Sequence, residues 1–375
     1  MSGEYAAALA GVLRDETVPP GALATDPAAF VRACGDDDLT GLVYEVISRQ
    51  DAGDNWVRFV RDALAPEARA HSAEEMLRRQ ELVGVLDALA AAGVQPILIK
   101  GIALAYSVYR APAGRRCRDT DLLIRRDDEG TVRRILGDRG YTPPLWCDGE
   151  LLFCQFPLKK TDAFGFVHTL DFHWKISTQS FFADLLGFDE VLGAATGLPA
   201  LGAHVRAAGP LHALLLACIH PVMHHRNARS LVWIYDVHLL ASRLSVREFD
   251  RFAELASAKQ VAAICAHQLT LAARWMGTRI PDSALQTLEA VGRRERSAAY
   301  LRPNRRWTGE LVSNLQGLSS WRDRMRLLRD VVLPPPDYML RAYGVASSSL
   351  GQVFLPVLYV HRLAAGGWKV IVGRK

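Results

Sequence analysis

The chain has 375 residues, of which 50% are hydrophobic and 23% are charged, and its net charge is +5. This composition excludes a disordered chain and, at this length, suits two or three compact units rather than one small core. The basic excess is compatible with an anionic ligand but is far below that of a nucleic-acid-binding tail, so no nucleic-acid partner is expected.

The six cysteines form no CxxC pair and have no regular spacing, which argues against a zinc ribbon and a disulfide framework. A reducing compartment is expected, and no signal peptide is evident at the amino terminus, so the predicted location is cytoplasmic. No apolar run approaches the roughly 20 residues that span a bilayer. The closest, VFLPVLYV at 353–360, is expected to pack against the protein, with a membrane surface as the alternative.

Residues 1–93 are predicted to form helices. In HSAEEMLRRQELVGVLDALAAAGV, apolar residues recur at helical spacing and predict one broad buried stripe. The stripe comprises Met76, Leu77, Leu82, Val83, Val85, Leu86 and Leu89.

Residues 94–184 alternate between β-rich and helical runs. QPILIK is predicted to be a strand, GIALAYSVYR a helix beginning at Gly101, APAGRRC a loop and RDTDLLI a second strand. The next helix is expected to begin at Asp127 or Asp128 and to end at Gly140. LLFCQFPL and FGFVHTLDFHWKI are further β-like runs.

Residues 185–375 return to helical spacing, for example in HALLLACIHPVMHHRN and LVWIYDVHLLASRL. The predicted fold class is therefore α+β. A small mixed-sheet domain would be embedded between a helical amino-terminal region and a helical carboxy-terminal region.

Asp119 and Asp121 occupy alternate positions of the second strand and are expected to project from the same face. Two neighbouring carboxylates repel each other and resist burial unless a cation holds them. Three arrangements would allow the two carboxylates to lie side by side. They could form ion pairs with Arg115, Arg116 or Arg118, they could be exposed to solvent at a strand end, or they could bind a metal.

Two neighbouring features favour the metal. Lys100 and Gly101 lead from a strand directly into a helix amino terminus, where backbone N–H groups can receive a phosphate. In VHTLDFHWKI, alternation places Leu170, Phe172, Trp174 and Ile176 on one face, and Thr169, Asp171, His173 and Lys175 on the other. Three aspartates beside a phosphate-accepting turn are the parts of a two-metal phosphoryl- or nucleotidyl-transfer site, for which Mg²⁺ or Mn²⁺ is the expected cofactor.

The order LIKG, RDTDLLI, LDFHW resembles the nucleotidyltransferase (DNA polymerase β-like) superfamily, and within it a bacterial group of uncharacterised nucleotidyltransferases. The resemblance covers residues 95–176 and extends more weakly through the helical segment that follows. It implies that Asp119 and Asp121 ligate both metals, and that Asp171 ligates the metal that activates the acceptor hydroxyl.

The same resemblance makes Gly101 the turn glycine of the triphosphate site. Ile102 departs from the family pattern, since many relatives have a phosphate-binding serine or glycine there. Lys100 is expected to compensate, and Arg118 is a further candidate for phosphate contact.

His220 and Asp236 lie on consecutive predicted helices and are candidates to face the nucleotide or the acceptor. A hydrogen bond in helix packing is the alternative for both. His220 and His224 also have the i, i+4 spacing of zinc ligands, although core or capping histidines are commoner.

The expected function is transfer of a nucleoside monophosphate from an NTP, with ATP as the expected donor, to an acceptor hydroxyl. The acceptor could be a small molecule, a peptide or a protein. One alternative is a catalytically silent nucleotide-binding or scaffold protein of the same fold. Another is a metal-dependent glycosyltransferase, because a DxD pair also chelates sugar-nucleotide diphosphates.

Overall fold

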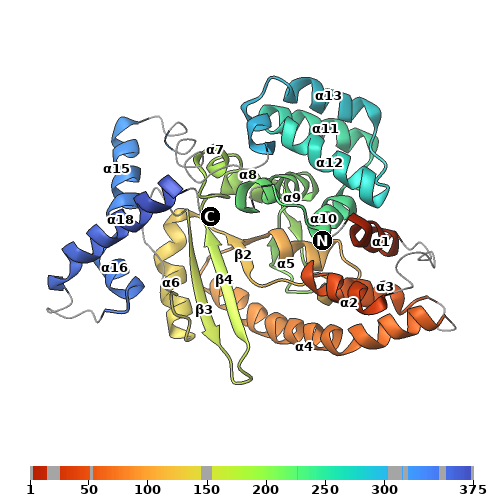
Figure 1. Cartoon of the computed structure of the whole chain (residues 1–375), viewed down its shortest axis with the longest axis horizontal. Coiled ribbons are helices and arrows are strands. Elements are labelled where there is room, and N and C mark those ends of the chain that lie inside the picture. The colour runs from red at the N-terminus through yellow and green to blue at the C-terminus, as the bar shows by residue number, and fades with distance from the viewer. Residues whose placement is uncertain are drawn as a thin grey trace.

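The computed structural model describes residues 3–14, 26–50, 54–144, 154–225, 227–302, 315, 320–345 and 352–372. Helices surround one mixed β-sheet (Figure 1). The predicted α+β class is confirmed.

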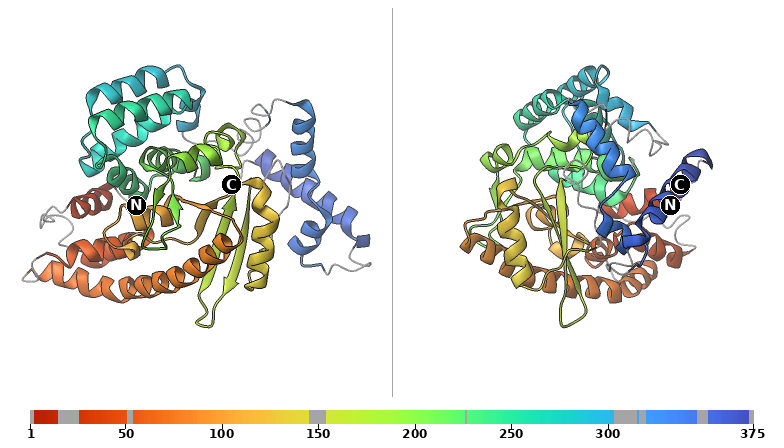
Figure 2. Two further views of the ribbon diagram at one scale, coloured as in Figure 1. Left: turned by 180° about the vertical axis from the view of Figure 1, so that it is seen from behind. Right: turned by 90° about the vertical axis from the view of Figure 1, so that its left-hand side faces the viewer.

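The amino-terminal region is helical, as predicted. It contains α1 (Gly3–Leu13), α2 (Pro27–Asp36), α3 (Thr40–Ile47) and α4 (Asn55–Ala91). Helix α4 is 37 residues long and runs along the lower side of the molecule (Figures 1 and 2). Leu82, Val85, Leu86 and Leu89 are buried as expected, but Met76 is 73% exposed, so the predicted stripe was wrong at that position.

The sheet has six strands in the order β3-β4-β2-β1-β6-β5. The strands are β1 (Ile97–Ile99), β2 (Thr120–Leu123), β3 (Gln155–Thr161), β4 (Val167–His173), β5 (Thr196–Gly197) and β6 (Arg206–Ala207). Strand β2 is antiparallel to β1 and parallel to β4, while β3 and β4 form an antiparallel hairpin. The central strand β2 is therefore flanked on both sides.

Two helices connect the central strands. Helix α5 (Lys100–Ser107) follows β1 without a loop and begins one residue earlier than predicted. Helix α6 (Glu129–Asp138) follows β2 after a short 3₁₀ turn.

The β-like runs are shorter in the structure than in the prediction. In LLFCQFPL the strand begins at Gln155, and residues 151–153 lie outside the described part. Strand β4 ends at His173, so the predicted alternation through Ile176 was wrong beyond that residue. The pair β5–β6 extends the sheet past residue 184, and the predicted domain boundary does not coincide with the sheet edge.

The two faces of the sheet pack against different helices. Leu98, Leu122 and Phe172 form one core with α4 and α6, whereas Ile97, Ile99 and Leu123 face the larger core. Asp121 is paired directly with Ile99 across the β1–β2 ladder, so its side chain lies on the face of the larger core.

The carboxy-terminal helices complete that larger core. They are α9 (Pro210–His225), α10 (Leu231–Ala241), α11 (Val246–Ala258), α12 (Ala262–Met276) and α13 (Asp282–Gly292), preceded by the short α7 (Ser180–Ala183) and α8 (Phe188–Gly193). Residues of α1 to α3 pack in the same core as residues of α9 to α13. The regions at 1–93 and 185–375 are therefore joined by shared packing.

The last three described helices are α15 (Trp321–Val332), α16 (Pro336–Ala342) and α18 (Leu355–Val372). They lie together at one side of the molecule, in blue in Figure 1. Within the described ranges, every helix is too short or too polar to cross a bilayer.

Candidate active site

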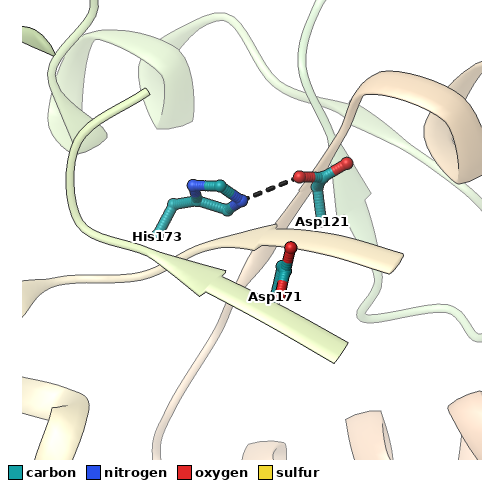
Figure 3. A group of neighbouring side chains, drawn as sticks. All are labelled: Asp121, Asp171 and His173. Atoms are coloured by element: carbon teal, nitrogen blue, oxygen red, sulfur yellow. Dashed lines mark hydrogen bonds and ion pairs between the residues drawn. The ribbon is translucent and has the colours of Figure 1, made fainter. Parts of the chain in front are cut away.

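Asp121 and Asp171 are brought together by strand register. They are direct partners in the parallel β2–β4 ladder, and parallel partners project from the same face. With His173, two residues further along β4, they form a group whose ligand atoms all lie within 4.8 Å of one another. Figure 3 shows the three side chains converging over the two strands.

One oxygen of Asp121 is shared by two nitrogen donors. Lys100 Nζ donates to Asp121 Oδ1 at 2.7 Å, and His173 Nε2 donates to the same oxygen at 2.7 Å. Lys100 lies at the β1–α5 junction with φ of 57°, a left-handed conformation that costs a lysine about 1 kcal/mol. This conformation turns the chain from β1 directly into α5 and places the ammonium beside β2.

The electrostatics of the two aspartates are opposite. Burial would raise the pKa of Asp121, but the Lys100 ammonium and the His173 hydrogen bond outweigh it and hold that pKa well below its ordinary value. Burial, together with the charges of Asp121 and Asp119, raises the pKa of Asp171 to about 7. At neutral pH Asp121 is therefore ionised, whereas Asp171 is protonated in about half of the molecules.

The hydrogen bonding of Asp171 indicates whether a metal cation could bind between Asp121 and Asp171. Its Oδ1 atom is buried and has no hydrogen-bond partner among the described residues, and the same holds for His173 Nδ1. An orphaned carboxylate oxygen next to an ionised carboxylate is a donor set suited to a hard divalent cation. Asp121 and Asp171 therefore fit a hard divalent cation.

Asp119 lies just before β2 and is exposed. It is not part of the close three-residue group. Partial desolvation by the surrounding protein and the charge of Asp121 nevertheless raise its pKa, while Lys100 and Arg115 lower it. Asp119 therefore belongs to the same electrostatic neighbourhood, at the rim of the group.

The arginines before β2 hold other carboxylates. Arg115 Nη2 lies 2.9 Å from Asp236 Oδ2, and Arg116 and Arg118 both pair with Asp38, at 3.1 and 3.0 Å. The alternative in which these arginines are the main partners of the aspartate pair was therefore wrong for Asp121, whose cation is Lys100.

Asp236 is buried within a network that connects α10 to the loop before β2. Besides Arg115, Tyr109 donates its hydroxyl to Asp236 Oδ1 at 2.6 Å. The structure thus shows the packing role for this carboxylate, and nucleotide contact by Asp236 stays a prediction. Arg118 keeps an exposed side chain beside Asp119, and its contact with phosphate also stays a prediction.

Gly101 is the second residue of α5 and is closely packed. A Cβ atom at this position would lie 3.1 Å from Cys117 Sγ and 3.9 Å from Arg115 Nη2. Ile102, next in the chain, is buried in the core of α4 and α6, so its side chain takes no part in the site.

His220 on α9 faces the same region. Burial and the Lys100 ammonium hold its pKa well below the ordinary value, and its Nδ1 atom is buried without a partner in the described part of the chain. Its ring lies 5.4 Å from that of His224 and 5.6 Å from that of Trp233, measured between centroids. Within the described residues these histidines do not form a close metal-ligand group, so the zinc hypothesis gains no support.

His173 is the residue that sequence reasoning left out of the site. Its position two residues after Asp171 placed it on the polar face. Its bond to Asp121, which is 52 residues away, depends on the pairing of β2 with β4, and no local pattern reports that pairing.

The family model of the uncharacterised nucleotidyltransferases matches residues 24–277. The match spans the sheet, the three aspartates and helices α2 to α12. None of the curated proteins matches the chain.

Proposed function

The chain belongs to the uncharacterised nucleotidyltransferase family, and we propose that it transfers a nucleoside monophosphate from an NTP to an acceptor hydroxyl in a Mg²⁺-dependent reaction. Nucleotidyl transfer itself follows from the family. The observation that supports metal dependence is the pairing of Asp121 with Asp171, of which Asp171 has a buried oxygen with no hydrogen-bond partner among the described residues.

Asp119, Asp121 and Asp171 are the proposed metal ligands, with Mn²⁺ as the substitute ion. When bound, divalent cations supply charge stabilisation for the attacking and leaving oxygens of the transfer. Asp121 contributes a carboxylate that is ionised throughout the physiological range, because Lys100 and His173 lower its pKa. His173 orients Asp121 through the Nε2 hydrogen bond, in the manner of residues that position metal ligands.

Lys100 and Gly101 are the proposed triphosphate contacts, with ATP as the donor. Gly101 lies in the first turn of α5, where N–H groups without helical partners point outward. Lys100 can exchange Asp121 for a phosphate oxygen by rotating its flexible side chain. Arg118 lies at the exposed rim and could approach the same phosphates.

His220 is proposed to contact the nucleotide or the acceptor, because its Nδ1 atom has no partner in the described part of the chain and its ring lies near enough to Lys100 for the ammonium, together with burial, to lower its pKa. For Asp236 we propose an indirect role, in which it positions Arg115 and the loop before β2. The acceptor is a hydroxyl of a small molecule, a peptide or a protein, and the reaction is placed in the cytoplasm, where NTPs are available.

The test is release of pyrophosphate from each of the four NTPs, with Mg²⁺ or Mn²⁺ and with lysate of the source cell as the acceptor pool. We expect Asp171→Ala to keep most of its NTP affinity and to lose at least ~10²-fold in turnover, because charge stabilisation at the attacking oxygen is removed. Asp127→Ala, an exposed position outside the site, is the matched control.

Three results would contradict the proposal. NTP binding of equal affinity with and without EDTA would argue against a metal. Absence of turnover in the wild type would favour the silent nucleotide-binding alternative. Consumption of a UDP-sugar in place of an NTP would favour the glycosyltransferase.

A further inference from the structure

The positive charge of the chain is concentrated at its carboxy-terminal end. Residues 321–375 contain nine Lys and Arg residues and three Asp residues, an excess of six, whereas the whole chain has a net charge of +5. The family match ends at residue 277, so this basic segment lies outside it. Such an asymmetry indicates a separate partner of negative charge.

Helix α15 combines that charge with exposed apolar side chains. Trp321, Met325 and Val332 are 40% to 70% exposed, and their i, i+4, i+11 spacing places them on one face of the helix. Arg322 and Arg329 are seven residues apart and border this face on one side. Leu327 is buried, so the helix is already packed along a different face.

Helix α18 adds a second row of exposed apolar side chains. Val357, Val360 and Leu363 are 46% to 67% exposed, and the residues just before the helix, Val353 and Phe354, are more than half exposed. Arg362 lies on the opposite side of α18 from this row, and its guanidinium is 5.8 Å from the centre of the Tyr338 ring on α16. Helices α16 and α18 are therefore in contact, and α15 and α18 each carry an exposed apolar row.

We propose that α15 to α18 dock on the surface of an anionic lipid bilayer. Apolar side chains bordered by arginines suit the boundary between lipid headgroups and acyl chains, where the apolar groups are buried and the cations meet lipid phosphates. Docking requires no spanning helix, in agreement with the described helices, none of which could cross a bilayer.

Charge and composition favour lipid over two other partners. A second copy of the chain would bring together two surfaces of the same positive sign, and these repel each other. Nucleic acid would satisfy the arginines but would leave the Trp321, Met325, Val357 and Val360 side chains without an apolar partner.

The experiment is cosedimentation of the full-length protein with vesicles of phosphatidylcholine alone or with 30% phosphatidylglycerol. We expect a partition coefficient at least ~10-fold higher for the anionic vesicles, and its reduction by 0.5 M salt, because surface charges are then screened. Failure to sediment with anionic vesicles, or equal binding to both compositions, would overturn the proposal. Nucleotide turnover plays no part in this measurement, so it is independent of the proposed function.

Two variants test the assigned surface. Met325→Glu with Val357→Glu should lower the partition coefficient at least ~10-fold, because each carboxylate would enter the apolar boundary. Arg322→Glu with Arg329→Glu should lower it by at least about fivefold for each position. Met76→Glu, at a 73% exposed position on α4, is the control and should bind like the wild type.

Equal thermal melting temperatures would show that the variants remain folded. If both double variants bind anionic vesicles with the same partition coefficient as the Met76→Glu control, the proposal would be overturned. Release of the bound protein by a DNA oligonucleotide would also overturn it, in favour of nucleic acid.

Discussion

The Lys100 ammonium lies 2.7 Å from Asp121 Oδ1, and both side chains are about nine-tenths buried. A lysine at the β1–α5 junction thus neutralises an aspartate in the neighbouring strand. Because His173 donates to the same oxygen, the carboxylate stays ionised inside the protein without a metal. The pair therefore contributes both to the stability of the metal-free fold and to the charge state of the proposed ligand.

Replacing Lys100 should destabilise the metal-free protein. Lys100→Met leaves Asp121 buried with His173 as its remaining donor, and loss of one partner of a buried pair costs about 3 kcal/mol. The free energy of unfolding, measured in urea with EDTA, should fall by roughly that amount. The double variant Lys100→Met, Asp121→Asn should recover part of the loss, since the unpaired charge is then removed.

The control for this experiment is Lys175→Met. Lys175 Nζ lies 2.8 Å from Asp184 Oδ1, but the two side chains are 39% and 73% exposed. An exposed pair contributes less than about 1 kcal/mol. Equal effects of the Lys100 and Lys175 variants would show that the Lys100–Asp121 pair is not a buried determinant of stability.

The pKa of Asp171 predicts a pH dependence of stability. In the metal-free folded state this pKa is about 7, above the ordinary value of about 4 that applies to the unfolded chain. At pH values between about 4 and 7, Asp171 is protonated in the folded state and ionised in the unfolded state. The contribution of Asp171 to the free energy of unfolding therefore falls as pH rises through this range, and it is constant above pH 7. Asp171→Asn removes this loss.

The melting temperatures of wild type and Asp171→Asn in EDTA should therefore converge near pH 4. The variant should be the more stable above pH 7, by up to about 4 kcal/mol in free energy of unfolding, since each pKa unit corresponds to about 1.4 kcal/mol. Asp127→Asn at an exposed position controls for the general loss of a negative charge. A difference between wild type and Asp171→Asn that is the same at every pH would rule out titration of Asp171 in this window.

Asp236 should matter for the loop before β2. Its carboxylate is 4% exposed and is bound by Arg115 and Tyr109, so Asp236→Asn would leave a buried guanidinium without its counter-charge. We expect a loss of about 3–5 kcal/mol in free energy of unfolding and faster hydrogen exchange over residues 110–118. Asp38→Asn, which removes the more exposed pairs with Arg116 and Arg118, should cost less than about 1 kcal/mol. If the backbone amides of residues 110–118 exchange at the same rate in the Asp236→Asn and Asp38→Asn variants, Asp236 does not position the loop.

Periodicity was sufficient to place Asp121 and Asp171 on their strands, whereas Asp119, predicted on the same strand as Asp121, lies one residue before β2. The Lys100–Gly101 junction indicated the start of α5 to within one residue, and alternation around Asp171 indicated β4 but carried it three residues beyond its end at His173. These features depend on residues close in sequence, which local patterns report.

Contacts between distant segments could not be derived in this way. Arg115 and Asp236 are 121 residues apart, and their pairing depends on how α10 packs beside the sheet. The strands β5 and β6 have two residues each, too few to show alternation. Met76 follows the helical spacing but is 73% exposed, because spacing within α4 does not report which part of the helix other elements cover.

The role of Gly101 can be separated from its packing. In Gly101→Ala the new methyl group would lie 3.1 Å from Cys117 Sγ, a crowded contact, so the variant should lose about 1–3 kcal/mol in stability. Adding Cys117→Ala removes the sulfur and should restore the melting temperature.

If phosphate must approach the backbone at Gly101, NTP affinity measured by calorimetry with Mg²⁺ will stay reduced in the double variant, because the methyl group still blocks the first turn of α5. Cys117→Ala alone should bind NTP like the wild type. Affinity that returns together with stability would mean that Gly101 serves packing against Cys117 and that the triphosphate is bound elsewhere.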